Sequence, residues 1–221
     1  MSVLLVFSKT TGYRHDSIPA GVAALTEIGA SIGLDVDATE NAGAFESENL
    51  SRCAAVVFLS TSGTVFDNDG QRAALESYVT RGGGFVGSHA ASTTEYGWPF
   101  YGELIGARFM GHPPVQPATV IVEDGSHQAT SHLEATWTLT DEWYDFADDP
   151  RPRVKVLLSV DESTYEGGAM GSGHPIAWHH EVGAGRCFYT ALGHRIEAYS
   201  DPSFRAHLAG GIRFVSRQAA P

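Results

Sequence analysis

The chain has 221 residues, and 43% of them are hydrophobic. That length and apolar content suffice for one large buried core, so we expect a single domain over residues 1–217 and a short tail over residues 218–221. The 26 Asp and Glu residues outnumber the 14 Lys and Arg residues, which gives a net charge of −12. An acidic surface repels a phosphate backbone, so this balance argues against a nucleic-acid partner.

The N-terminal apolar run, residues 3–7, is too short to cross a bilayer and has neither a basic segment before it nor a cleavage site after it. The two cysteines, Cys53 and Cys187, lie in apolar runs and belong to no disulfide framework or zinc-binding motif. We therefore expect a cytoplasmic protein without a membrane partner, in which residues 3–7 form the first strand.

The first half of the chain alternates between strand and helix patterns. Continuous apolar runs predict buried strands over residues 3–7, 34–39, 54–59 and 85–87. Apolar residues at three- and four-residue steps predict helices over residues 18–32 and about 67–81. This alternation predicts an α/β fold, a three-layer sandwich with a mainly parallel central sheet covered by helices on both faces.

The second half is more mixed. Its patterns predict helices over residues 98–105 and 202–215, and strands over residues 118–122, 154–160, 176–181 and 186–192. The last two strands are joined by residues 182–185, a glycine-containing turn typical of a β-hairpin. Exposed strand edges in this half are compatible with a homo-oligomer.

Histidines gather in the loops that follow predicted strands. His15, His89 and His194 come after three different strands, and ligands in such folds bind outside the carboxyl ends of the parallel strands. His89 takes the apex of a strand–turn–helix elbow, where a serine hydrolase carries its nucleophile, whereas Ser88 is one position too early. An imidazole at this apex favours a base, a hydrogen-bond donor or a ligand.

We expect His89 and His194 to act as an acid/base pair, with Glu197 as the carboxylate that orients His194. Glu142 lies in the run Asp141-Glu-Trp-Tyr144, where carboxylates beside aromatic rings suit a sugar site. The residues expected to bind the substrate are His15, Arg14, Tyr96, Trp98, His112, Glu142, Trp178 and His179.

Metal binding is a separate hypothesis. Histidine with Asp or Glu in a parallel-sheet crevice suits a divalent ion such as zinc. No pair of ligands has a diagnostic local spacing, so separate loops would have to supply the ligands. The candidates are His15, His112 and His194.

Six runs spread along the chain carry a family resemblance. They are Phe7-Ser-Lys-Thr-Thr-Gly-Tyr-Arg-His15, Phe85-Val-Gly-Ser-His89, Leu104-Ile-Gly106 with Phe109 and His112-Pro113, Asp141-Glu-Trp-Tyr144, His174-Pro-Ile-Ala-Trp178 and Gly183-Ala-Gly-Arg-Cys-Phe-Tyr-Thr-Ala-Leu-Gly-His194. With these runs in this order, the chain resembles the ThuA-like (trehalose-utilisation) family over nearly its whole length. The resemblance implies a flavodoxin-like fold of the class I glutamine amidotransferase type.

That superfamily places a cysteine at the elbow and a histidine after a late strand. Here His89 stands at the elbow and His194 at the late strand, so the resemblance does not extend to amidotransferase chemistry. It implies instead a role in carbohydrate metabolism, in the use of trehalose, a related disaccharide or a 3-keto-sugar, with a small sugar as partner. Three hypotheses follow: a hydrolase, lyase or isomerase acting on the sugar, a non-catalytic sugar-binding or regulatory module, and a metal-dependent hydrolase.

Overall fold

The computed structural model describes residues 2–219; Met1 and residues 220–221, which end the predicted tail, lie outside the described residues. A nine-stranded mixed sheet forms the centre, in the order β2-β1-β3-β4-β11-β10-β9-β6-β7. A small two-stranded sheet, β5 with β8, lies beside it. No helix among the described residues is long and apolar enough to span a membrane.

Five neighbouring strands of the large sheet run parallel. They are β2 (Asp35–Thr39), β1 (Val3–Phe7), β3 (Cys53–Leu59), β4 (Gly84–Ser88) and β11 (Gly185–Thr190). The central strands are buried almost throughout because helices cover both faces, which explains their unbroken apolar runs. The predicted strands of this half are confirmed to within two residues.

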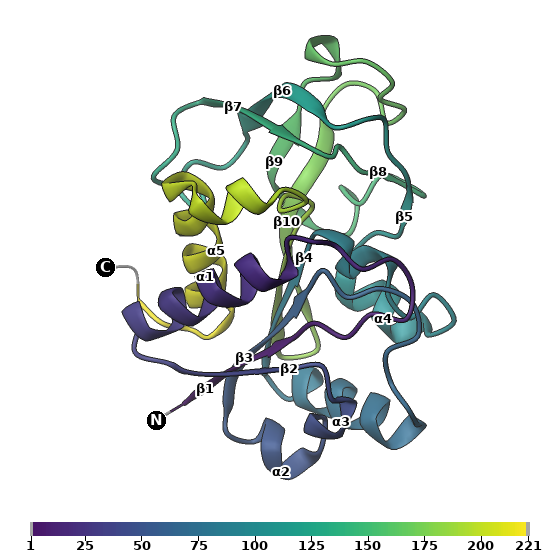
Figure 1. The fold of residues 1–221 in the computed structure, drawn as a ribbon, viewed down its shortest axis with the longest axis vertical. Helices are drawn as coiled ribbons and strands as arrows, with labels where there is room; N and C mark the ends of the chain where they lie inside the picture. The colour runs from purple at the N-terminus through teal and green to yellow at the C-terminus, as the bar shows by residue number, and fades with distance from the viewer. Residues whose placement is uncertain (1, 220–221) are drawn as a thin grey trace.

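Helices pack on both faces of this half (Figure 1). On one face, α1 (Ile18–Ser31) and α5 (Pro202–Val215) contact each other, and α5 covers β4 and β11. The other face carries α2 (Ser47–Leu50), α3 (Asp69–Thr80) and α4 (Pro99–Ile105). The predicted three-layer α/β architecture is therefore confirmed, with the short α2 as an addition. Short 3-10 turns lie at Ala42–Ala44, His89–Thr93, Glu162–Thr164 and Ile196–Ser200.

The other half of the sheet is antiparallel. It contains β10 (His174–Val182), β9 (Lys155–Val160), β6 (Gln116–Val122) and β7 (Thr136–Asp141). The predicted hairpin is confirmed, since Val182 pairs with Gly185. The strands β5 (Phe109–Gly111), β7 and β8 (Asp145–Phe146) were not predicted, because they are partly exposed or very short and lack a clear apolar pattern.

The loops at the carboxyl ends of the parallel strands are joined by hydrogen bonds. The Thr11 amide donates to the Ser62 carbonyl, which ties the loop after β1 to the loop after β3. Ser17 stands at the N-cap position of α1, but its side chain does not cap the helix. Its hydroxyl donates instead to the Gly193 carbonyl at 3.0 Å. That bond links the loop after β1 to the loop after β11, so segments far apart in sequence form one rigid rim.

Candidate functional site

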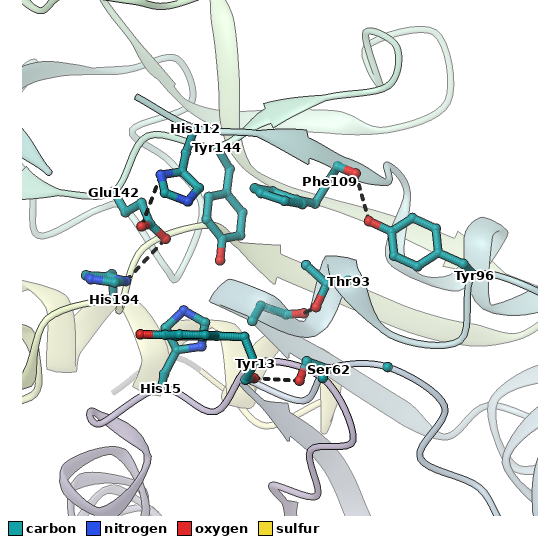
Figure 2. Close-up of a pocket in the computed structure, with 13 residues that line it drawn as sticks. Tyr13, His15, Ser62, Thr93, Tyr96, Phe109, His112, Glu142, Tyr144 and His194 are labelled. Atoms are coloured by element: carbon teal, nitrogen blue, oxygen red, sulfur yellow. Dashed lines mark hydrogen bonds and ion pairs between the residues drawn. The ribbon is translucent and has the colours of Figure 1, made fainter. Parts of the chain in front are cut away.

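A cavity of about 590 Å³ opens at this rim (Figure 2). Its walls come from the loops after β1, β3, β4 and β11, together with the segments around β5 and β8. The lining residues are Gly12, Tyr13, His15, Ser62, Gly63, Ala90, Thr93, Tyr96, Phe109, His112, Glu142, Tyr144 and His194. The predicted strand-end location of the pocket matches this cavity.

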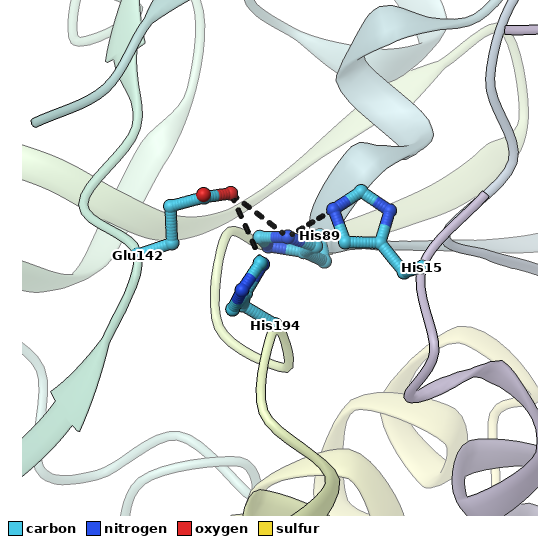
Figure 3. A group of neighbouring side chains, drawn as sticks. All are labelled: His15, His89, Glu142 and His194. Carbon is cyan, nitrogen blue, oxygen red and sulfur yellow. Dashed lines mark hydrogen bonds and ion pairs between the residues drawn. The ribbon is translucent and has the colours of Figure 1, made fainter. Parts of the chain in front are cut away.

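Glu142 is the shared partner of the histidines in the cavity floor. One carboxylate oxygen, Oε2, lies 3.2 Å from His194 Nδ1 and 3.5 Å from His89 Nε2. The other, Oε1, lies 3.1 Å from His112 Nδ1. His15 joins the group through its Nε2, which is 3.1 Å from His89 Nε2 (Figure 3). Four imidazoles from four separate segments therefore converge around one carboxylate.

The hydrogen-bond partners define which ring nitrogens carry protons. His89 Nδ1 lies 2.7 Å from the Ala191 carbonyl, which only accepts, so Nδ1 is the donor and Nε2 of the neutral ring is an acceptor. His112 Nδ1 likewise faces the Pro113 carbonyl at 2.9 Å as well as Glu142. The free acceptor of His112 is therefore Nε2, on a side chain that is 39% exposed and lines the cavity.

The elbow predicted at His89 is present. His89 directly follows β4 and has a φ of 51°, the left-handed region that costs a non-glycine residue about 1–3 kcal/mol. Hydrogen bonds on both sides hold this conformation: Tyr189 Oη donates to the His89 carbonyl at 2.8 Å, and the ring donates to Ala191. The strained backbone aims the imidazole at Glu142, although His89 itself is fully buried and does not line the cavity.

The charges within the cluster differ from residue to residue. Burial, aided by the neighbouring imidazoles of His89 and His194, lowers the pKa of His15 to about 3, so this ring is neutral at neutral pH. The hydrogen bond to Glu142 raises the pKa of His194. Burial acts to raise the pKa of Glu142, but the contact with His194 and the attraction of the neighbouring imidazoles outweigh it and hold that pKa below its ordinary value. The ionised carboxylate thus favours a proton on His194.

Asp141, which the sequence did not mark as a site residue, supports this arrangement from behind. Its buried carboxylate accepts hydrogen bonds from the backbone amides of Gly193 at 2.9 Å, His194 at 3.1 Å and Glu142 at 2.9 Å. Burial raises the pKa of Asp141, and the three amides act against that shift. The carboxylate clamps the backbone that carries His194 to the backbone that carries Glu142.

Tyr144 is a second residue that sequence reasoning missed. Its hydroxyl lies 3.0 Å from His89 Nε2, and its ring lines the cavity. Glu142 and Tyr144 are two residues apart in extended chain, which places them on the same side, while Trp143 points into the core and donates to the Gln116 carbonyl. The alternation of side-chain directions in the run Asp141–Tyr144 was therefore the sequence signal from which a site role for Tyr144 could have been predicted.

Two exposed tyrosines stand at the mouth of the cavity. Tyr96, an expected sugar-binding residue, is 55% exposed, and its hydroxyl donates to the Phe109 carbonyl at 2.7 Å. Tyr13, which was not predicted, is 69% exposed and packs edge-on against His15 with ring centroids 4.8 Å apart. Exposed aromatic faces beside polar groups are suited to stack on sugar rings.

The two tryptophans expected to bind the substrate lie elsewhere. Trp178, on β10, is fully buried and donates its indole N–H to the Ile105 carbonyl at 3.0 Å. Trp98 precedes α4 and packs against Phe66, with ring centroids 5.9 Å apart. The substrate-binding role predicted for Trp178 is wrong, because its ring is enclosed by the core. Trp98 does not line the cavity either.

Glu197, the carboxylate expected to orient His194, does not contact it. Glu197 is exposed and pairs with Arg195 at 3.2 Å, whereas the partner of His194 is Glu142. The predicted role of Glu197 is therefore corrected. Glu197 was chosen because it is close to His194 in sequence. It belongs, however, to the 3-10 turn at Ile196–Ser200, and no residue of that turn lines the cavity.

Two further expected binding residues lie outside the cavity. Arg14 forms an exposed ion pair with Glu40 at 2.7 Å. His179 stacks on His127, with ring centroids 4.7 Å apart, beside the C-terminal end of α5. Arg14 lies between Tyr13 and His15, which line the cavity, but its own side chain turns outward to Glu40. His179 belongs to β10, and no residue of that strand lines the cavity.

The comparisons with known proteins agree with this fold. The ThuA family model, described as trehalose utilisation, matches residues 3–215. The chain belongs to the ThuA family. A solved ThuA-like protein from Bacteroides uniformis shares 24% identity at a TM-score of 0.81, covering 97% of this chain and 91% of that one. A ThuA-like protein from Parabacteroides merdae shares 19% identity at a TM-score of 0.80, covering 100% and 92%.

The ThuA fold also extends into a larger enzyme. A β-galactosidase from Bacillus circulans shares 13% identity at a TM-score of 0.62, covering 99% of this chain but only 32% of the galactosidase. At these identities the solved structures establish the fold alone. No protein among curated sequences matches the chain.

Proposed function

We propose that this ThuA-family protein binds trehalose, a related disaccharide or its 3-keto derivative in the cavity and transfers protons at the sugar. One observation supports this above others: both oxygens of Glu142 hold an imidazole by its Nδ1, His112 on one side and His194 on the other. The family's link to trehalose use and the exposed tyrosines at the cavity mouth support a sugar as the ligand.

In this proposal His112 is the general base. Its Nδ1–H is held by Glu142 and the Pro113 carbonyl, so Nε2 is free to accept a proton. A carboxylate that orients an imidazole in this way is a recurring means of activating a base. Removal of a proton next to a sugar carbonyl is the reaction that such a base serves best.

His194 and His15 stand opposite, where the substrate oxygen would lie. Removal of the proton leaves negative charge on that oxygen, and a protonated His194 beside Glu142 stabilises it. His89 does not reach the cavity, so we assign it a positioning role toward His15, Glu142 and Tyr144 rather than the acid/base role that its elbow position suggests. We place the reaction in the cytoplasm, where both free thiols stay reduced.

The test is solvent exchange. Protein and a 3-keto-disaccharide are incubated in D₂O, and loss of the proton next to the carbonyl is followed by NMR. We expect wild-type protein to accelerate exchange and His112→Gln to reduce the rate by about 10²-fold or more, with an unchanged circular dichroism spectrum. The matched control is His132→Gln, because His132 is exposed, does not line the cavity and contacts the Ser203 carbonyl instead.

A folded wild-type protein that binds the sugar but causes no exchange would contradict the proposal. That result would favour the second hypothesis, a non-catalytic sugar-binding module. Such a module is recognised by thermal stabilisation on addition of the sugar without any conversion.

A further inference from the structure

We infer that His15, His89, His194 and Glu142 form a binding site for one divalent transition-metal ion, with zinc as the representative ion. The inference deepens the proposed function, because the ion would lie on the side of the cavity where the substrate oxygen is expected. It rests on that function only for the role of the ion, since binding itself is measured without any sugar.

The separations between the potential ligand atoms fit a single ion. Each of the four residues offers one nitrogen or oxygen, and these atoms all lie within 4.8 Å of one another. Zinc is held at about 2.0–2.1 Å by imidazole nitrogen, which for a tetrahedron puts neighbouring ligand atoms roughly 3.3 Å apart. The corresponding separations in this structure are 3.1 Å between His15 and His89, 3.5 Å between His89 and Glu142, and 3.2 Å between His194 and Glu142.

The protonation pattern also fits. His89 donates its Nδ1–H to the Ala191 carbonyl, so its Nε2 lone pair points into the cluster. Metal-bound histidines characteristically donate their second nitrogen to a carbonyl or carboxylate in this way. The Tyr144 hydroxyl, 3.0 Å from His89 Nε2, donates to the same lone pair, so an ion would displace that hydrogen bond. The lone pair of His89 and the Glu142 carboxylate are both acceptors only 3.5 Å apart, an arrangement that a cation between them stabilises.

The surroundings hold the ligands in place. Asp141 binds the backbone amides of both Glu142 and His194 and so sets two of the four ligands in register. His112 contacts Glu142 Oε1, which leaves Oε2 to face the other imidazoles. Partners of this kind, which hold ligands rather than the ion, are a regular part of built metal sites.

A second group of potential ligands, Asp145, Glu162 and His174, does not share these properties. Glu162 Oε1 already accepts the backbone amides of residues 170 and 171 and lies 2.9 Å from His174 Nδ1. His174 Nε2 donates to the Tyr144 carbonyl at 2.8 Å, and no residue of this group lines the cavity. Because this group lies outside the cavity and its Glu162 carboxylate already binds two backbone amides, we assign the ion to the first group.

In the proposed proton transfer the ion would replace the proton on His194 as the positive charge that stabilises the substrate oxygen. His15 and His194 line the cavity, so an ion between them faces the substrate. The C–H proton would pass to His112 Nε2, and the electron pair of that bond would become the enolate, with its oxygen bound to the ion. Glu142 would connect the two events, since Oε2 faces the ion and Oε1 orients the base.

The test uses untagged protein freed of metal by a chelator and then dialysed. Calorimetric titration with ZnCl₂ is expected to show one ion bound per chain. Co²⁺ in its place is expected to give the visible absorption of a four- or five-coordinate nitrogen–oxygen site. His194→Asn and Glu142→Gln should each weaken zinc binding at least 10²-fold while the circular dichroism spectrum is retained. Glu197→Gln, an exposed carboxylate, serves as the matched control, and Glu162→Gln tests the second group.

Absence of zinc binding at stoichiometric concentration would overturn the inference. So would binding that survives both His194→Asn and Glu142→Gln, or that is lost in Glu162→Gln. The two proposals fail separately. Deuterium exchange that persists in fully metal-free protein rejects the role of the ion in the reaction and leaves both the proton transfer and the zinc titration to stand on their own results. Stoichiometric zinc binding at this cluster without any exchange rejects the proton transfer and leaves the metal site standing.

Discussion

Buried histidines occur in two different settings in this protein. His15, in the cavity floor, is 5% exposed, and His207, inside α5, is not exposed at all. Burial lowers the pKa of both, to about 3 for His15 and about 4 for His207. The neighbours differ, however. His207 donates to a single backbone carbonyl, that of Ala129, among the apolar side chains of the core, whereas His15 faces other imidazoles beside a carboxylate.

The difference shows that burial and a lowered pKa do not by themselves mark a functional histidine. Convergence of several polar groups on one point, with access to a cavity, separates His15 from His207. Substitutions in the two settings should therefore have different consequences. Changes in the cluster should affect chemistry more than stability, and changes at His207 should affect stability alone.

The largest effect is expected from Glu142→Gln. The amide keeps the shape of the side chain but removes the charge that orients both His112 and His194. We expect deuterium exchange into the 3-keto-disaccharide to fall by about 10³-fold or more, while the protein remains folded. A variant that retains more than a tenth of the wild-type exchange rate would show that Glu142 is not the centre of the site.

At His207 the expected effect is on the pH dependence of stability. Since the folded-state pKa lies below the ordinary value of 6.5, the unfolded chain binds this proton first as the pH falls. The free energy of unfolding therefore loses on the order of 3 kcal/mol from this group between pH 6.5 and pH 4, and nothing above pH 6.5. His207→Asn keeps a donor for Ala129 but does not titrate. Urea unfolding at both pH values should show a smaller loss in the variant, and an equal loss would argue against this origin.

His89→Asn is expected to have a smaller effect on activity. Asn tolerates the left-handed backbone at this position better than most residues, so the elbow should persist. The variant loses the ring that holds His15 and Tyr144, and we expect an exchange rate about 10-fold to 10²-fold below wild type. If the wild-type pH profile of exchange is kept together with the wild-type rate, His89 has no positioning role.

Glu197→Gln should change almost nothing. The side chain is exposed and pairs only with Arg195, and such surface pairs contribute about 0–1 kcal/mol. Exchange rate and melting temperature should both stay close to those of wild type. A loss comparable to that of Glu142→Gln would restore Glu197 to the role that its sequence position suggested.

Local patterns in the sequence determined the parallel half of the molecule. Unbroken apolar runs predicted β1, β3 and β4 because strands covered on both faces need apolar side chains at every position. The carboxyl ends of parallel strands meet at one edge, so His15, His89 and His194 were predicted to converge, and the structure brings them together. The elbow at His89, directly after β4, was also recognisable from sequence.

Only the tertiary structure decided how these histidines are paired. Glu142 enters the cluster from the segment after β7, an edge strand with a mixed pattern, and it replaces Glu197, which is far closer to His194 in sequence. The same holds for Trp178, whose strand carries it into the core instead of the cavity. Side-chain periodicity is a local property, whereas the packing of antiparallel strands and loops depends on contacts between residues 50 or more positions apart, as between Glu142 and His194. The pairing of Glu142 with His112 and His194 therefore emerges only once the whole chain has folded.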